Sequence, residues 1–388
     1  MSSRTRVIVM TISAPVIAFA VVGGFLGKAM AREDTYQHLK IFDDVVSLIM
    51  SNYVEQANVE KVMRGAMHGL ADGLDPDSAY LPADAVKQIE TGAPLAPGDV
   101  GIDLTRQYYL RVIATRDDSP AAKAGIRTGD YIRAINETQT REMSVWEGMR
   151  ALRGATGSKV TVTVIRGNAA DPHVIDLVRV PIPAGDVTGR IAAPGVGYVR
   201  IAAIANGTAG RLRTQIQELT KNGAAKVIID IRRTSGGQLE TGLELARLFV
   251  ANGTLAMRET RGGARETIAA AAGDGTIAQP VVLLVDAGTS AAAELFASAL
   301  VGNKRAELIG EHTIGRAATQ KLVKLPDGAG LWLSTSRYLT PSGAPLHEKG
   351  LEPTVAVDEP DVEFGQTAPP GDPVLEKALE RLTEKKAA

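Results

Sequence analysis

The chain has 388 residues, which is enough for about two or three domains with a substantial hydrophobic core. Its 43 basic and 44 acidic residues balance, so its composition gives no electrostatic reason to expect a nucleic-acid partner. Cysteine is absent, which excludes thiol catalysis, disulfides and thiolate metal sites, and the 5 scattered histidines contain no metal-binding pair, so we expect no metal.

Residues 1–31 have the pattern of an export signal. Arg4 and Arg6 precede an apolar run over 7–26, and the small-residue pattern Ala29-Met30-Ala31 follows it. The run is longer than the ~7–15 residues of a signal core and close to the ~20 of a spanning helix. A cleaved signal peptide and a retained membrane anchor therefore both stay open. In either case we expect the remainder to be exported, either periplasmic or anchored to the inner membrane and facing outward.

Residues 32–96 predict an N-terminal helical region. Apolar residues recur at helical spacing between about 36 and 88, which indicates two or three amphipathic helices. The stretch L-D-P-D-S-A-Y-L-P at 74–82 interrupts them with turn chemistry. A Pro/Gly-rich linker at 91–98 then favours a domain boundary near residue 96.

Residues 97–182 change to short alternating strands, of which 108–113 and 159–165 are the clearest. Between them, S-P-A-A-K-A-G-I-R-T-G-D-Y-I-R-A-I-N at 119–136 predicts a short helix, a glycine break and a strand. A second helix is expected over 143–152. We treat this segment as a small separate domain.

Residues 183–358 alternate strands with helices, which predicts a mostly parallel sheet covered by helices. Strands are expected at 196–201, 227–231, 281–285 and near 307–309, with a hairpin over 320–325 and 330–337. Helices are expected at 208–219, 239–250 and 291–300. Residues 359–388 predict a loose linker and a short charged helix from residue 374, either solvated or docking.

Two strand-to-helix corners of this region could bind negative charge. Gly236 and Gly237 follow one buried strand and precede a helix, so their amide N–H groups can point outward. The amide of Ala292 begins the next such helix. If the two strands are neighbours, both corners lie on one rim of the sheet and form an oxyanion site. A plain tight turn is the alternative for the glycine pair.

Several motifs, in order over about 36–357, resemble those of the carboxyl-terminal processing (tail-specific) serine proteases. The stretch L-D-P-D-S-A-Y-L stands where the family commonly has L-D-P-H-S-x-Y-L, so Asp77 replaces a histidine. The block from Ser119 is that of a PDZ domain. D-I-R-R-T-S-G-G matches the family's D-L-R-x-N-P-G-G, and R-Y-L-T-P-S-G-A-P-L-H-E-K-G-L-E-P matches its closing motif.

The resemblance implies a mixed α/β (α+β) multidomain fold, with a crotonase-like protease core at 183–358, an inserted PDZ domain at 97–182 and an N-terminal helical segment. Enzymes of this family cut proteins near their C-termini with a Ser–Lys dyad and need no cofactor. The PDZ domain is expected to bind protein or peptide C-termini by strand addition. The matching capture loop begins at Asp99 and contains Gly101, Ile102, Asp103 and Leu104.

The dyad positions depart from the family pattern. When Gly288 and Glu294 are aligned with the family's G-S-A-S-A-S-E, the nucleophile position falls on Ala291. The same register places Arg316 at the lysine and Gln320 at the glutamine that follows it. Alanine has no nucleophilic atom, and arginine stays protonated, so the resemblance implies that the dyad is lost.

Three hypotheses follow. The favoured one is a catalytically impaired homologue that binds C-terminal peptides or a partner protease. The second is an active serine endopeptidase that uses Ser290 as a displaced nucleophile, with His312, Lys304 or Lys321 as the base. Against it, Ser290 is expected to N-cap the helix predicted at 291–300. The third is a self-associating scaffold in which the PDZ domain is the working module.

Overall fold

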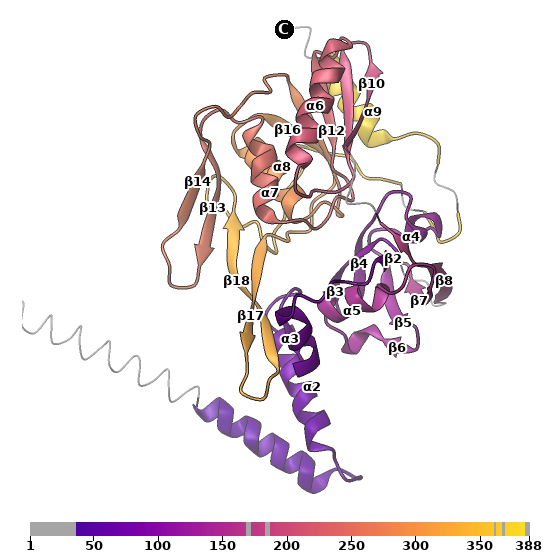
Figure 1. Cartoon of the computed structure of the whole chain (residues 1–388), viewed down its shortest axis with the longest axis vertical. Helices are drawn as coiled ribbons and strands as arrows, with labels where there is room; N and C mark the ends of the chain where they lie inside the picture. The colour runs from indigo at the N-terminus through magenta and orange to yellow at the C-terminus, as the bar shows by residue number, and fades with distance from the viewer. Residues whose placement is uncertain (1–35, 168–171, 183–186, 361, 367–368, 385–388) are drawn as a thin grey trace, which may run out of the picture. The chain divides into compact units, whose positions relative to one another are not determined.

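The computed structural model describes residues 36–167, 172–182, 187–360, 362–366 and 369–384 (Figure 1). The predicted signal or anchor, 1–31, lies outside these residues. No helix in the described part of the chain is long and apolar enough to span a membrane. The predicted N-terminal helices are present at residues 36–52, α2 (Val59–Asp72) and α3 (Ala83–Glu90).

The core contains a six-stranded sheet whose central strands are parallel, as predicted. Its order is β10-β11-β12-β15-β16-β19, and only β10 runs antiparallel to its neighbour. The strands are β10 (Val187–Ala193), β11 (Val196–Ile201), β12 (Lys226–Asp230), β15 (Val281–Val285), β16 (Ala306–Gly310) and β19 (Val355–Ala356). Strands β10 and β19 are not among the strands predicted from the sequence.

Both faces of this sheet are covered, which explains the unbroken apolar run of β15. Val281, Leu283 and Val285 pack in the cluster formed with α6 (Thr208–Lys221), α7 (Leu239–Arg247) and α8 (Ala292–Gly302). The alternate residues Val282 and Leu284 face the other way, into a cluster formed with α9 (Pro373–Glu384). The charged C-terminal helix is therefore a docking helix.

A second sheet has the order β1-β18-β13-β14, with β17 paired to β18. Its strands are β1 (Ala79–Leu81), β13 (Thr254–Thr260), β14 (Glu266–Ala269), β17 (Ala318–Lys324) and β18 (Gly330–Leu339). The predicted hairpin at 320–337 is β17–β18, whose register places Gln320 opposite Ser334. The long orange hairpin is visible in Figure 1.

The segment predicted as a PDZ domain forms its own sheet, in the order β3-β4-β5-β7-β8, around a separate apolar core. The strands are β3 (Ile102–Gln107), β4 (Tyr109–Thr115), β5 (Tyr131–Ile135), β7 (Lys159–Ile165) and β8 (His173–Val178). Helix α5 (Val145–Leu152) begins at a capping box, in which Ser144 and Glu147 bond each other's backbone N–H. Among the strands that the structure describes, β3 pairs with β4 alone, so β3 is an edge strand.

Candidate active and peptide-binding site

The turn between β15 and α8 has the sharp geometry that the strand–turn–helix pattern predicts. Ala291 is the N-cap of α8, with φ 54° and ψ −118°. A non-glycine residue rarely adopts positive φ, and holding it there costs about 1–3 kcal/mol. The strained position of this turn is therefore the position that aligns with the family's nucleophile, and it carries a methyl group.

Ser290 does not cap the helix, so that prediction is wrong. Helix α8 begins at Ala292, one residue later than expected, and its N-cap Ala291 provides no side-chain hydrogen bond. Ser290 is fully buried, and its hydroxyl has no hydrogen-bond partner in the described structure. Its backbone N–H donates to the Thr234 carbonyl oxygen at 3.1 Å.

The candidate bases for Ser290 are not bonded to it. His312 has a side chain that is 47% exposed and lies 3.5 Å from the carboxylate of Glu352. Lys304 follows the C-terminal end of α8, whereas Ser290 precedes its first turn. Lys321 is an exposed residue of β17.

The two amide corners lie on the same rim, because β12 and β15 are neighbouring parallel strands. The Ala292 N–H donates to the carbonyl oxygen of Gly236 at 3.4 Å. Gly236 and Gly237 both have positive φ, 73° and 79°. A glycine pair can rotate its shared peptide at small steric cost. The structure thus brings the predicted oxyanion residues together, and of their three amides the Ala292 N–H already donates to the carbonyl oxygen of Gly236.

Glu294, in the first turn of α8, holds the loop that carries Arg316. Its carboxylate accepts the backbone N–H of Gly315 and of Arg316, each at 2.8 Å, and the hydroxyl of Thr313. Burial raises the pKa of Glu294 to about 7, although these hydrogen bonds oppose the shift. The glutamate of the family motif therefore positions the dyad loop against the turn.

Arg316 forms an ion pair with Asp77. Its Nε lies 3.2 Å from Asp77 Oδ2, its Nη2 contacts Oδ1, and its Nη1 donates to the Leu104 carbonyl oxygen at 3.2 Å. Burial acts to lower the pKa of Arg316, but the charge and hydrogen bonds of Asp77, together with the charges of Asp103 and Glu294, outweigh burial, and the pKa lies above its usual value. Asp77 stands where the family has a histidine, and the sequence alone does not explain this replacement. In the structure, Asp77 is the counter-charge of Arg316.

A cavity of about 370 Å³ joins Arg316 and Gln320 to helix α5. Its apolar walls include Trp146, Met149 and Trp332. Gln320 Nε2 donates to the hydroxyl of Ser334 at 3.1 Å. Two residues of the predicted catalytic set therefore face the same space as the PDZ helix.

The predicted capture loop is filled by its own side chain. Asp99 Oδ1 accepts the backbone N–H of Val100 at 2.7 Å and of Gly101 at 3.0 Å, and the Asp99 carboxylate pairs with Arg153 at 2.8 Å. Asp103 accepts the hydroxyl of Ser235 at 2.6 Å. The backbone amides of Val100 and Gly101, which were expected to bind a peptide carboxylate, therefore already bind the carboxylate of Asp99. This role of Asp99 was not predicted from the sequence.

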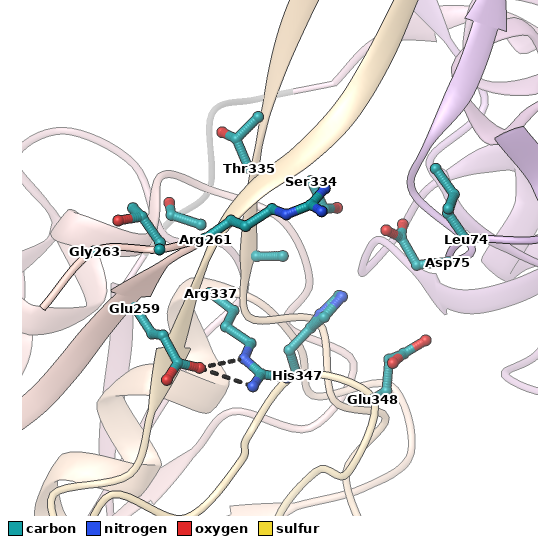
Figure 2. Close-up of a pocket in the computed structure, with 14 residues that line it drawn as sticks. Leu74, Asp75, Glu259, Arg261, Gly263, Ser334, Thr335, Arg337, His347 and Glu348 are labelled. Atoms are coloured by element: carbon teal, nitrogen blue, oxygen red, sulfur yellow. Dashed lines mark hydrogen bonds and ion pairs between the residues drawn. The ribbon is translucent and has the colours of Figure 1, made fainter. Parts of the chain in front are cut away.

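A second pocket, of about 520 Å³, lies beside β18 and contains His347 (Figure 2). His347 Nδ1 accepts the backbone N–H of Ala317 at 3.3 Å, so the neutral ring carries its proton on Nε2. That Nε2 is buried without a hydrogen-bond partner in the described structure. Figure 2 shows the ring between Asp75 and the Glu259–Arg337 ion pair. His347 is not among the site residues predicted from the sequence.

No group of His, Asp or Glu side chains in the described part of the chain is arranged to hold a metal ion.

Comparison with known proteins identifies the family. A profile of peptidase family S41 matches residues 195–357, and a PDZ domain profile matches 111–166. A carboxyl-terminal-processing protease of Synechocystis sp. is 32% identical over 301 residues, which cover 76% of this chain and 70% of that protein. The chain belongs to peptidase family S41. The predicted membership of the C-terminal processing peptidases and the PDZ domain are confirmed.

A second relative and a solved structure are also similar to this chain. A carboxy-terminal-processing protease of Bartonella bacilliformis is 29% identical over 362 residues, which cover 89% of this chain and 83% of that one. The solved structure of a photosystem II D1 C-terminal processing protease matches with a TM-score of 0.69 and 28% identity, covering 80% and 85% of the two chains. The predicted mixed α/β multidomain S41 fold with its PDZ insertion is confirmed.

The S41 match spans positions 291, 316 and 320, but it does not test what these residues do. The PDZ match begins at residue 111, so it leaves out β3 and the predicted capture loop. A PDZ domain suggests that the ligands are peptide C-termini. The capture residues and the domain boundaries of this S41 peptidase stay predictions.

Proposed function

We propose that this member of the S41 family is an exported protein that captures the C-termini of other proteins and is impaired in the family's dyad chemistry. The Arg316–Asp77 ion pair carries the proposal. It puts a permanently charged guanidinium, already bound to a carboxylate, where the family has a lysine base. A guanidinium with a raised pKa has no lone pair to accept a proton at neutral pH.

Ala291 supports the same conclusion from the nucleophile's side. Covalent catalysis by a serine peptidase begins with attack by a hydroxyl oxygen, and Ala291 presents none. The alternative nucleophile, Ser290, is fully buried and has no hydrogen bond to a base. The displaced-nucleophile hypothesis therefore receives no support from its surroundings.

Peptide capture would use the free edge of β3. An added peptide strand needs backbone donors and acceptors on that edge, and an apolar pocket for its terminal side chain. The cavity walled by Trp146, Met149 and Trp332 provides the apolar surface, and Arg153, which pairs with Asp99, provides positive charge for a carboxylate. Because Arg316 Nη1 occupies the Leu104 carbonyl oxygen, capture would have to displace this bond.

Self-association is a second proposed property, through the helix at residues 36–52. Its side chains Leu39 and Leu48 are 62% and 61% exposed, and Ile41 is 57% exposed. An amphipathic helix with exposed apolar residues gains stability by covering them. A second copy of this helix or a partner protease would cover these side chains. The export pattern of residues 1–31 supports the proposal that this contact forms outside the cytoplasm.

The test is peptide binding together with cleavage. The exported part, from residue 32, is mixed with a fluorescent unstructured peptide that ends in an apolar residue, and with the same peptide carrying a C-terminal amide. We expect a Kd of about 1–100 μM for the free acid, weaker binding of the amide, and an intact mass for both. Cleavage that is lost in Ser290→Ala would overturn the proposal in favour of the active endopeptidase.

A further inference from the structure

A charged cavity of about 640 Å³ lies between the PDZ sheet and the turn that leads to Ala291. The two parts approach closely there. A Cβ added at Gly288 would lie 2.7 Å from the carbonyl oxygen of Ile113 and 3.1 Å from Oγ1 of Thr128. Both of these atoms belong to the PDZ segment, so the absence of a side chain at Gly288 permits the contact. Asp286, in the same turn, lines the cavity.

Most of the charges around this cavity are already paired. Arg166 holds Asp130 at 2.7 Å. Arg232 holds Asp372 at 2.7 Å and Glu359 at 3.0 Å.

The two remaining carboxylates of the lining, Asp286 and Glu311, are used by the backbone. Asp286 Oδ1 accepts the backbone N–H of Arg233 at 2.8 Å and of Gly288 at 3.0 Å. Glu311 Oε1 accepts the backbone N–H of Glu359 at 3.0 Å. In the described lining, neither carboxylate forms an ion pair with an arginine.

Three arginines of the described lining, Arg111, Arg127 and Arg233, form no ion pair, and Arg111 is held by the carbonyl oxygen of Gly129 and the side-chain oxygen of Gln107. Within the described residues, the guanidinium of Arg127 makes no hydrogen bond or ion pair, and Arg233 Nε is buried without an acceptor. Arg233 also has a left-handed backbone, with φ 55°. A buried donor without an acceptor costs about 1–3 kcal/mol, and more when it is charged. Among the described residues, the Arg127 guanidinium and the Arg233 Nε are therefore donors that a negatively charged oxygen atom could use.

We propose that this cavity binds a small polyanion, with phosphate or carboxylate oxygens held between Arg127 and Arg233. Guanidinium groups bind both kinds of oxyanion through paired N–H donors. Arg127 belongs to the PDZ segment and Arg233 to the S41 core, so one bound anion links the two. Because Asp286 receives the Arg233 N–H and also caps the turn at Gly288, the ligand lies next to the turn that carries Ala291. The site does not depend on whether the protein cleaves peptides.

The test is calorimetric titration of the purified full chain with pyrophosphate and, separately, with citrate, at constant ionic strength. We expect at least one probe to bind, and Arg127→Gln and Arg233→Gln each to weaken that probe by about tenfold. Arg213→Gln is the matched control, because Arg213 is exposed on α6 and remote in sequence from the lining residues. Unchanged melting temperatures show that the variants remain folded, and Arg127→Gln removes no contact that the described structure contains.

The two probes separate the sources of the ligand chemistry. Binding of pyrophosphate alone assigns a phosphate ligand, and binding of citrate alone assigns a polycarboxylate. Failure of both to bind at about 10 mM, or binding that is equally strong in folded Arg127→Gln and Arg233→Gln, would overturn the proposal.

Discussion

Arg316 and Asp77 lie 239 positions apart in the chain and form a two-pronged ion pair, with Arg316 Nε 3.2 Å from Asp77 Oδ2. Each of them stands where the family motif has a different residue. A lone arginine at position 316 would lack a counter-charge, and a lone aspartate at position 77, only 7% exposed, would lack a cation. The two replacements therefore make physical sense together, as one exchange within a single contact.

Removing Asp77 should destabilise the protein. Asp77→Ala leaves the partly buried Arg316 guanidinium without its carboxylate, and the expected loss in the free energy of unfolding is about 1–3 kcal/mol. Urea unfolding measures it. Asp84→Ala, an exposed residue of α3, is the control and should stay within about 0.5 kcal/mol of the parent. Equal stability of the two variants would show that the ion pair contributes nothing.

Releasing the Leu104 carbonyl should strengthen peptide capture. Arg316→Gln removes the guanidinium that donates to this acceptor on the edge of β3, so an incoming peptide strand no longer competes with it. We expect a decrease in Kd of about threefold to tenfold by fluorescence anisotropy, equivalent to about one weak hydrogen bond. Lys321→Gln, exposed on β17, is the control. Weaker binding in Arg316→Gln would mean that Arg316 holds the peptide instead of opposing it.

Because the backbone of Ala291 is strained, the substitution Ala291→Gly should raise the free energy of unfolding. Glycine adopts the observed φ of 54° without a steric penalty, while it raises the entropy of the unfolded chain by an amount worth about 0.4–1 kcal/mol. Relief of about 1–2 kcal/mol of strain leaves a net gain of about 0.5–1 kcal/mol for Ala291→Gly. Ala292→Gly, in the first turn of α8, should instead destabilise, and thermal melting distinguishes the two. Destabilisation by both would contradict the strained turn.

The raised pKa of Glu294 predicts how stability depends on pH. Its pKa rises from 4.5 in the unfolded chain to about 7 in the fold, so between these values the folded state binds more protons than the unfolded state. The contribution of Glu294 to stability therefore falls as the pH rises from about 4.5 to 7, by about 1–3 kcal/mol.

The comparison with Glu294→Gln isolates this contribution. The difference in unfolding free energy between the parent and the variant should shrink or change sign over the same pH window, as measured by urea unfolding at several pH values. A difference that stays constant from pH 4.5 to 7 would show that Glu294 does not titrate there.

The elements of the fold that could be predicted from the sequence are those whose own residues show an apolar run or a regular alternation. The apolar run of β15 predicted a strand, which the structure buries on both faces, and the alternation of strands and helices predicted the parallel sheet. Strands β13 and β14 were missed because their side chains are mostly polar and half-exposed, so they show no alternation. Strand β19 is only 2 residues long, too short for any pattern.

The sequence predicted which positions belong to the site, but not which side chains contact each other there. Motif alignment located Ala291, Arg316 and Gln320, yet nothing local connects Asp77 with Arg316 across the chain. The error at Ser290 arose because helix boundaries are uncertain by one or two residues, and one residue decides which side chain caps. The occupation of the capture loop by Asp99 depends on a side-chain rotation that sequence spacing does not specify.

The proposed function requires that Ala291 provide no nucleophilic atom while the protein still binds peptide C-termini. Mass spectrometry of a bound peptide, after prolonged incubation with the parent protein and with Ser290→Ala, tests it most directly. The account predicts that both proteins bind the peptide and that both leave its mass unchanged. Cleavage by the parent that disappears in Ser290→Ala would contradict it.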